Sequence, residues 1–313
     1  MIQRLLNRII LILFILLAAC KVNGQEYPWS LQYITNMYTI NPAYVGIWDR
    51  AGLGMSNRVN WVSINGAALY QHLSYNTPIK DQKSGFGVNA SRLTIGREKS
   101  LSFTGDYSYQ VRLDMHYYLR LGLRAGIINI DNNLNDYILY PDHINDPEFT
   151  TDVRLYFMTV FGVGAVLYNE NYYISFSIPQ MINNSFNVNR DLYSSMPQVT
   201  TMYLSGGYAF KIAGSLILRP NLLLVETIGK PIYFDAAALV YFPGNLQAGL
   251  HLRTNGAMCL SGQYTFRNNM RIGYAAEYYV LPDISKYQMG TYEFFIGYDF
   301  NLFRRKNIRT NYF

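Results

Sequence analysis

Residues 100–113 read SLSFTGDYSYQVRL, and apolar and polar side chains alternate along this stretch. One face is apolar or aromatic and consists of Leu101, Phe103, Tyr107, Tyr109, Val111 and Leu113. The other face is polar and consists of Ser102, Thr104, Asp106, Ser108, Gln110 and Arg112. A period of two predicts a β-strand. A strand of about ten residues is long enough to cross a membrane when it is tilted.

The same alternation recurs along the chain. The predicted strands cover 48–58, 65–77, 84–95, 100–113, 115–129, 156–169, 171–180, 201–211, 213–225, 232–241, 244–253, 257–266, 269–280 and 290–301. A secreted β-sandwich would show the same pattern, because it also buries one face and solvates the other. The number and length of the strands favour an all-β fold, namely a transmembrane antiparallel β-barrel of the outer-membrane type with about 14 strands.

Composition agrees with a barrel. Charged residues make up 15% and aromatic residues 16% of the chain, and 29 residues are Tyr, which favours strands and membrane interfaces. The net charge is +6, but no dense Lys/Arg stripe with interleaved aromatics supports nucleic-acid binding. The four His fit no metal spacing, and no phosphate loop or G-x-S-x-G elbow is present. We therefore expect no catalytic, cofactor-binding or metal-binding residues.

Four segments are predicted. Residues 1–24 read as an export signal, 25–47 as a periplasmic lead-in or partial plug, 48–303 as the outer-membrane barrel, and 304–313 as a basic tail. Cleavage before Gln25 is favoured over lipidation at Cys20, because a barrel already anchors itself.

The loops and the tail offer candidate partner-binding residues. Both termini of such a barrel are expected in the periplasm, and the long connections 130–155 and 181–200 are then expected to face outward. The first connection holds the acids Asp131, Asp136, Asp142, Asp146, Glu148 and Asp152, and the tail holds the cations Arg304, Arg305 and Lys306. Either set is interpreted as a solvated surface or as a docking site: the acids for a partner or cation, the tail for an acidic periplasmic partner.

Several motifs resemble one family in their order along the chain. Asn41-Pro42-Ala43-Tyr44 is followed by Gly46, then by Arg58 and Trp61. Later blocks are Gly85-Phe86-Gly87-Val88, Leu121-Gly122-Leu123-Arg124-Ala125-Gly126, Leu218-Arg219-Pro220 and Thr291-Tyr292-Glu293. Together they resemble the PorP/SprF family of Bacteroidota membrane proteins. The Asn41–Tyr44 block is interpreted as a structural element of the lead-in or plug, or alternatively as a periplasmic docking surface.

This resemblance implies a non-enzymatic outer-membrane component of the type IX secretion system. Such a component would anchor secretion or gliding machinery, or support export and surface retention of a large adhesin-type cargo. Its expected partners are secretion components in the periplasm and outer membrane, or a cargo's C-terminal sorting domain, together with outer-membrane lipid. The alternative is a passive channel lined by Arg112, Arg124, Arg253 and Glu277, and a third hypothesis is a barrel enzyme that acts on lipid.

Overall fold

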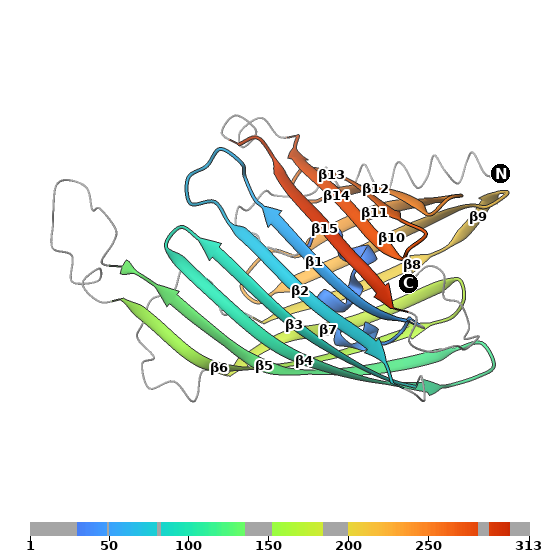
Figure 1. The fold of residues 1–313 in the computed structure, drawn as a ribbon, viewed down its shortest axis with the longest axis horizontal. Coiled ribbons are helices and arrows are strands. Elements are labelled where there is room, and N and C mark those ends of the chain that lie inside the picture. Colours follow the sequence, from blue (N-terminus) through green and yellow to red (C-terminus); the bar gives the residue numbers. More distant parts are fainter. Residues whose placement is uncertain are drawn as a thin grey trace.

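The protein folds into one antiparallel sheet that closes on itself (Figure 1). The computed structural model describes residues 30–48, 50–79, 83–134, 152–183, 200–280 and 288–300. The sheet closes because β1 pairs with β15 and β10 pairs with both β8 and β11. The strands are β1 (Ala51–Val59), β2 (Leu69–Pro78), β3 (Ser84–Ile95), β4 (Glu98–Arg112), β5 (Tyr118–Asn132), β6 (Val153–Tyr168), β7 (Tyr172–Asn183), β8 (Thr201–Tyr208), β9 (Phe210–Ala213), β10 (Leu216–Thr227), β11 (Tyr233–Phe242), β12 (Leu246–Arg253), β13 (Ala257–Thr265), β14 (Met270–Tyr279) and β15 (Thr291–Phe300). The predicted antiparallel barrel is confirmed.

The predicted strand 201–211 is divided into β8 and β9, which follow one another along β10. Asn221 pairs with Gly207 and Leu218 with Phe210, so Pro220 lies opposite the break between the two pieces. Proline has no backbone N–H to donate to the ladder, and this accounts for the interruption. Because β8 and β9 share one position, the fifteen described strands occupy fourteen positions around the barrel, as expected.

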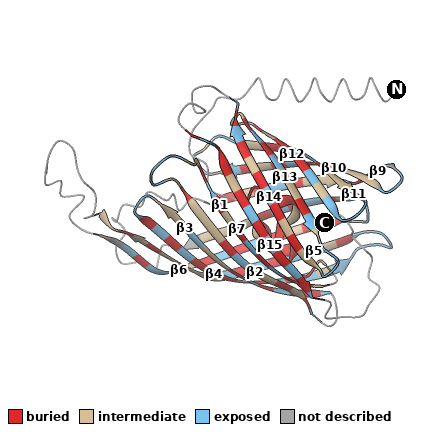
Figure 2. Cartoon of the chain, turned by 45° about the horizontal axis from the view of Figure 1, so that its top comes forward, coloured by how far each residue is buried: buried red, intermediate tan, exposed pale blue. Residues whose placement is uncertain are grey.

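The two faces of the wall differ as the alternation predicts. Figure 2 shows buried and exposed positions following one another along the strands. On β4, Leu101, Phe103 and Tyr107 are exposed, whereas Ser102 and Asp106 are buried. Apolar outward and polar inward positions are typical of a barrel in lipid. No helix among the described residues is long and apolar enough to cross a membrane.

Aromatic side chains gather at both ends of the barrel. We call the end where Ala51 pairs with Phe300 the near end, and the end where Val59 pairs with Tyr292 the far end. At the near end the rings of Tyr208 and Phe210 lie 4.4 Å apart, and similar pairs are formed by Tyr264 with Phe266 and by Tyr298 with Phe300. At the far end the hydroxyl oxygens of Tyr278 and Tyr292 lie 2.9 Å apart. These belts fit the two membrane–water interfaces.

The second predicted strand began too early, at residue 65 instead of Leu69. Residues 60–68 form a turn closed by a hydrogen bond from the Asn60 amide to the Ala68 carbonyl, 2.9 Å long. Within it Trp61, Ser63 and Gly66 have φ values of 43°, 84° and 77°, which a strand does not contain. Residues 1–29 and 301–313, which include the predicted signal and basic tail, lie outside the described part of the chain.

Candidate functional site

The most distinctive part of the structure is the segment of residues 30–48, which we call the inner segment. It forms three short 3₁₀ turns, η1 (Tyr33–Thr35), η2 (Met37–Thr39) and η3 (Pro42–Tyr44), drawn in blue within the barrel in Figure 1. Almost every residue from Ser30 to Val45 is buried. Its hydrogen-bond partners come from β2, β4, β5, β6, β7 and β15, so the segment contacts the wall on several sides.

Asn41 fixes the third turn to the wall. Its side-chain oxygen accepts a hydrogen bond from the Ala43 amide at 2.8 Å, while Pro42 occupies the first position of the turn. This is the usual capping arrangement, in which the proline has no amide that needs a partner. The side-chain nitrogen donates to Ser175 Oγ at 2.9 Å and to the carbonyl oxygens of Ala165 and Phe176 at 3.2 Å each. One side chain thus caps the turn and joins it to β6 and β7.

Glycines in the wall make room for this turn. A Cβ atom at Gly122 of β5 would collide with the backbone of Pro42 and Ala43, and one at Gly164 of β6 would collide with the Asn41 side chain. On β3, the space beside Gly85 is taken up by the Val45 carbonyl in the same way. A larger residue at any of these places would separate the inner segment from the wall, because the interior is close-packed.

Arg124 joins the wall to the second turn. Its Nε and Nη2 atoms donate to the two carboxylate oxygens of Asp106, at 2.7 and 2.8 Å. The same guanidinium donates to the carbonyl oxygens of Tyr38 at 2.9 Å and Thr39 at 3.2 Å. Since Asp106 and Arg124 are both buried, the pair needs this complete set of partners to offset its loss of water.

A second charge network lies at β11, β12 and β14. Arg253 donates from Nε to Asp235 at 2.8 Å and from Nη1 to Glu277, whose other oxygen lies 3.8 Å from Arg58. His251 Nδ1 lies 3.2 Å from the second oxygen of Asp235. These side chains are at most 1% exposed. They therefore pair with one another rather than with bulk water.

The start of the inner segment is held at β15. The carboxylate of Glu293 accepts hydrogen bonds from Ser30 Oγ and from the Leu31 amide, both 2.6 Å long. The side chain of Leu31 covers Cys259 and Ala275, and all three are fully buried. The thiol of Cys259 is therefore buried together with the start of the inner segment.

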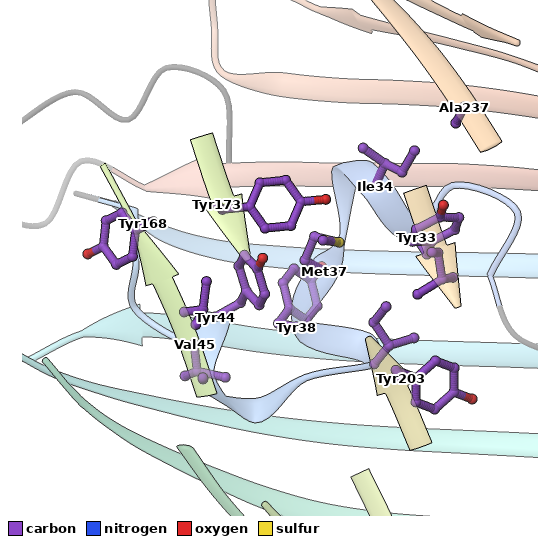
Figure 3. Close-up of a cluster of buried hydrophobic side chains, with 14 of the residues drawn as sticks. Tyr33, Ile34, Met37, Tyr38, Tyr44, Val45, Tyr168, Tyr173, Tyr203 and Ala237 are labelled. Carbon is purple, nitrogen blue, oxygen red and sulfur yellow. The ribbon is translucent and has the colours of Figure 1, made fainter. Parts of the chain in front are cut away.

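Apolar and aromatic side chains fill the space between these polar contacts. Figure 3 shows Tyr33, Met37 and Tyr44 of the inner segment packed among residues of the wall such as Tyr173 and Tyr203. The rings of Tyr44 and Tyr173 meet edge to face at 6.2 Å. Burial raises the pKa of Tyr33 and Tyr44 well above the ordinary tyrosine value, so both phenols stay neutral. The barrel interior at this level is a packed core.

The residues of the family motif fall in two places: 41–46 belong to the inner segment, whereas Arg58 and Trp61 lie at the far end of β1 and in the turn that follows it. Asn41, Pro42, Ala43 and Tyr44 are buried in the inner segment, and Gly46 has φ +67° at a point where it packs against Gly85. Arg58 is buried beside Glu277. The backbone amide of Trp61, which is partly exposed, donates to Thr291 Oγ1 at 3.3 Å.

The predicted acidic loop is described only at its ends. Asp131 and Asp152 lie 3.9 and 3.5 Å from Arg154, which follows the acid-rich stretch. Asp136, Asp142, Asp146, Glu148, Arg304, Arg305 and Lys306 lie outside the described residues.

The residues of the channel hypothesis do not line one surface. Arg124, Arg253 and Glu277 are buried and paired, whereas Arg112 is exposed at the end of β4 and donates to the carbonyl oxygens of Asp114 and Met115.

The main contacts missed by sequence reasoning are those of Asp106, Gly122, Gly164, Ser175 and Glu293. Alternation placed Asp106 and Arg124 on polar faces, but only the register, in which they are cross-strand partners, brings them together. The close packing of the inner segment against Gly122 and Gly164 could have been predicted from the presence of glycine at inward positions of β5 and β6.

Fold and interior together define an outer-membrane β-barrel whose interior holds its own N-terminal segment. The sequence model of the family described as "Type IX secretion system membrane protein PorP/SprF" matches residues 22–298. The chain therefore belongs to the PorP/SprF family, and the protein is an outer-membrane component of type IX secretion. The family is a secretion membrane component, not an enzyme class.

Solved structures resemble the chain only distantly. CdiB from Acinetobacter baumannii has 9% identity and a TM-score of 0.38, over 80% of this chain and 60% of that one. Omp33 of the same organism has 8% identity and a TM-score of 0.45, over 80% and 98%. A mutant form of the Rh. blastica porin has 10% identity and a TM-score of 0.35, over 80% and 99%. The comparison with curated proteins finds no match.

Proposed function

We propose that this protein is a non-enzymatic scaffold of the type IX secretion system. It anchors secretion or gliding components at the outer membrane, or supports export and surface retention of a large adhesin-type cargo. The observation that carries this proposal is the burial of the inner segment, from Ser30 to Val45, against strands on several sides of the barrel. A barrel whose described interior is packed in this way offers a stable outer surface for partners and leaves little room for water beside the inner segment.

The charge pairs support the same function. In a solute channel, charged side chains face the permeating solution and remain hydrated. Here Arg124 with Asp106 and Arg253 with Glu277 are withdrawn from water. Their hydrogen bonds to one another make them structural supports for the wall and, through Arg124, for the inner segment.

In the proposed orientation the near end faces the periplasm and the far end faces the cell exterior, since both termini of bacterial barrels lie in the periplasm. The leader is removed before Gln25. At the near end, the β4–β5 turn exposes Leu113 and Met115, and Met115 is 72% exposed. Apolar side chains that stand free of the wall suit a periplasmic protein partner. The basic tail with Arg304, Arg305 and Lys306 adds a charged contact on the same side, and the loops 130–155 and 181–200 lie outside.

Site-specific photo-crosslinking in native outer membranes tests this proposal. A photoreactive amino acid replaces Met115 at the near end or Ile228, which is 59% exposed, at the far end. The tagged protein is then recovered and its adducts are identified by mass spectrometry. We expect adducts with periplasmic secretion components at Met115, or with one large surface protein or its sorting domain at Ile228. The absence of protein adducts at both positions would contradict the scaffold function and favour the alternative of a passive channel.

A further inference from the structure

Three cations form a row on the outward face of the far end. Arg92 lies on β3, Lys99 on β4 and Arg154 on β6, and all three are exposed. Lys99 pairs across the sheet with Thr94 and Asp131, and Asp131 pairs with Arg154. Arg92 pairs with Leu101, whose exposed side chain belongs to the apolar outer face. Cross-strand partners point to the same side of a sheet, so the row faces away from the barrel interior.

The row begins where the apolar surface ends. On β4 the outward positions run from Val111 through Phe103 and Leu101 to Lys99. On β6 the exposed aromatic residues Tyr156 and Phe157 lie farther from the far end than Arg154 does. Apolar band, aromatic belt and then cations is the order met on crossing from lipid tails to head groups.

The positive charge of the row is only partly neutralised. Arg154 has the two acids Asp131 and Asp152 within 3.9 and 3.5 Å. Arg92 and Lys99 make no hydrogen bond or ion pair with the part of the chain that the structure describes. Within the described part of the chain, Arg92 and Lys99 are therefore the two exposed cations of the row that no acid neutralises by an ion pair.

The row is also local. The outward positions at the far ends of β1, β13, β14 and β15 are occupied by the uncharged residues Val59, Met258, Tyr278 and Phe294. On β10 the exposed charged residue near the far end is the acid Glu226. A general need for solubility would not concentrate cations at the far ends of β3, β4 and β6, which belong to one wall with β5 between β4 and β6.

We propose that Arg92, Lys99 and Arg154 form a binding site for the phosphate groups of a phosphorylated outer-leaflet lipid of the lipid A type. A guanidinium matches phosphate oxygens with two parallel donors, and a lysine adds a point charge beside it. The apolar side chains Leu101 and Phe103 lie against the acyl chains of the same lipid. This site goes beyond the proposed function, because it concerns the membrane around the barrel and requires no secretion partner.

The test is native mass spectrometry of the purified, folded full-length protein with added lipid A. The main variant is Arg92→Gln/Lys99→Gln/Arg154→Gln. Its matched control is Arg112→Gln/Lys211→Gln/Arg267→Gln, which removes three exposed cations from the near end. We expect the main variant to bind lipid A more weakly by on the order of a hundredfold, since each cation near a membrane surface contributes about fivefold. The control variant retains the affinity of the original protein.

Two further arms define the ligand. The original protein is expected to prefer lipid A to the same lipid with both phosphates removed, and inorganic phosphate alone is expected not to remain bound. Equal binding of both lipids, unchanged affinity in the main variant, or retention of inorganic phosphate without lipid preference would overturn the proposal. If the triple variant does not fold, Arg92→Gln/Lys99→Gln decides the question, because these exposed side chains make no hydrogen bond or ion pair with the described part of the chain.

Discussion

Arg124 of β5 holds both carboxylate oxygens of Asp106 on β4 and, with the same guanidinium, the carbonyl oxygens of Tyr38 and Thr39. One side chain thus connects two strands of the wall with residues that precede Arg124 by 85 and 86 positions in the sequence. The barrel wall and the inner segment therefore depend on each other for their packing.

Replacement of Asp106 by Asn is expected to destabilise the barrel strongly. It leaves the buried guanidinium of Arg124 without its counter-charge, a loss that costs about 3–5 kcal/mol. The free energy of unfolding is measured in urea by the shift in gel mobility between folded and unfolded barrel. Arg112→Gln, on the exposed end of the same strand, should change stability by no more than about 0.5 kcal/mol. Equal stabilities for the two variants would show that the buried pair does not support the fold.

Replacement of Gly122 by Ala should loosen the inner segment. The added methyl group collides with the backbone of Pro42 and Ala43, and overpacking of this kind costs about 1–3 kcal/mol. The matched control is Gly105→Ala on β4, where the nearest atom to the new methyl group is the Ala125 carbonyl oxygen at 3.9 Å. Limited proteolysis followed by mass spectrometry compares cleavage within 30–48 in the two variants. Faster cleavage is expected only for Gly122→Ala. Identical patterns for the two variants would contradict the close packing of Pro42 and Ala43 against Gly122.

The thiol of Cys259 reports whether the start of the inner segment stays in place. It is buried under Leu31, so a maleimide reagent should label the folded protein slowly. Glu293→Gln weakens the charged hydrogen bonds to Ser30 and Leu31, and labelling should then be about tenfold faster. Glu226→Gln, at an exposed position of β10, should leave the rate unchanged. Rapid labelling of the unmodified protein would mean that Leu31 does not cover the thiol.

The strands could be predicted from sequence because one physical rule governs them all. Lipid outside and packed polar groups inside require the alternation seen in residues 100–113, and each predicted strand overlaps an observed one. The divided strand was missed because its cause, Pro220, lies on the neighbouring strand. The predicted strand 65–77 extends into the turn at residues 60–68, because the alternation of side chains carries no information about backbone φ angles.

The contacts of the inner segment could not be read from the sequence. Asparagine before proline favours a turn, and the capping geometry of Asn41 and Pro42 follows from those residue types alone. Its partners Ser175 and Phe176, however, lie 134 and 135 positions away. Only the order and register of the strands bring them to the same place, and no local pattern encodes that register. The sequence likewise does not show that Asp131 and Asp152 of the acidic loop pair with Arg154, which lies just beyond the last acid of the loop.

Conductance of the purified full-length protein in planar lipid bilayers tests the central claim most directly. The account predicts that insertion produces no steady conductance, because the inner segment from Ser30 to Val45 is packed against the wall and the charged side chains of the interior are paired. A steady, ohmic open state of the unmodified protein would contradict it. That result would show that water and ions pass the inner segment, and would make the protein a channel.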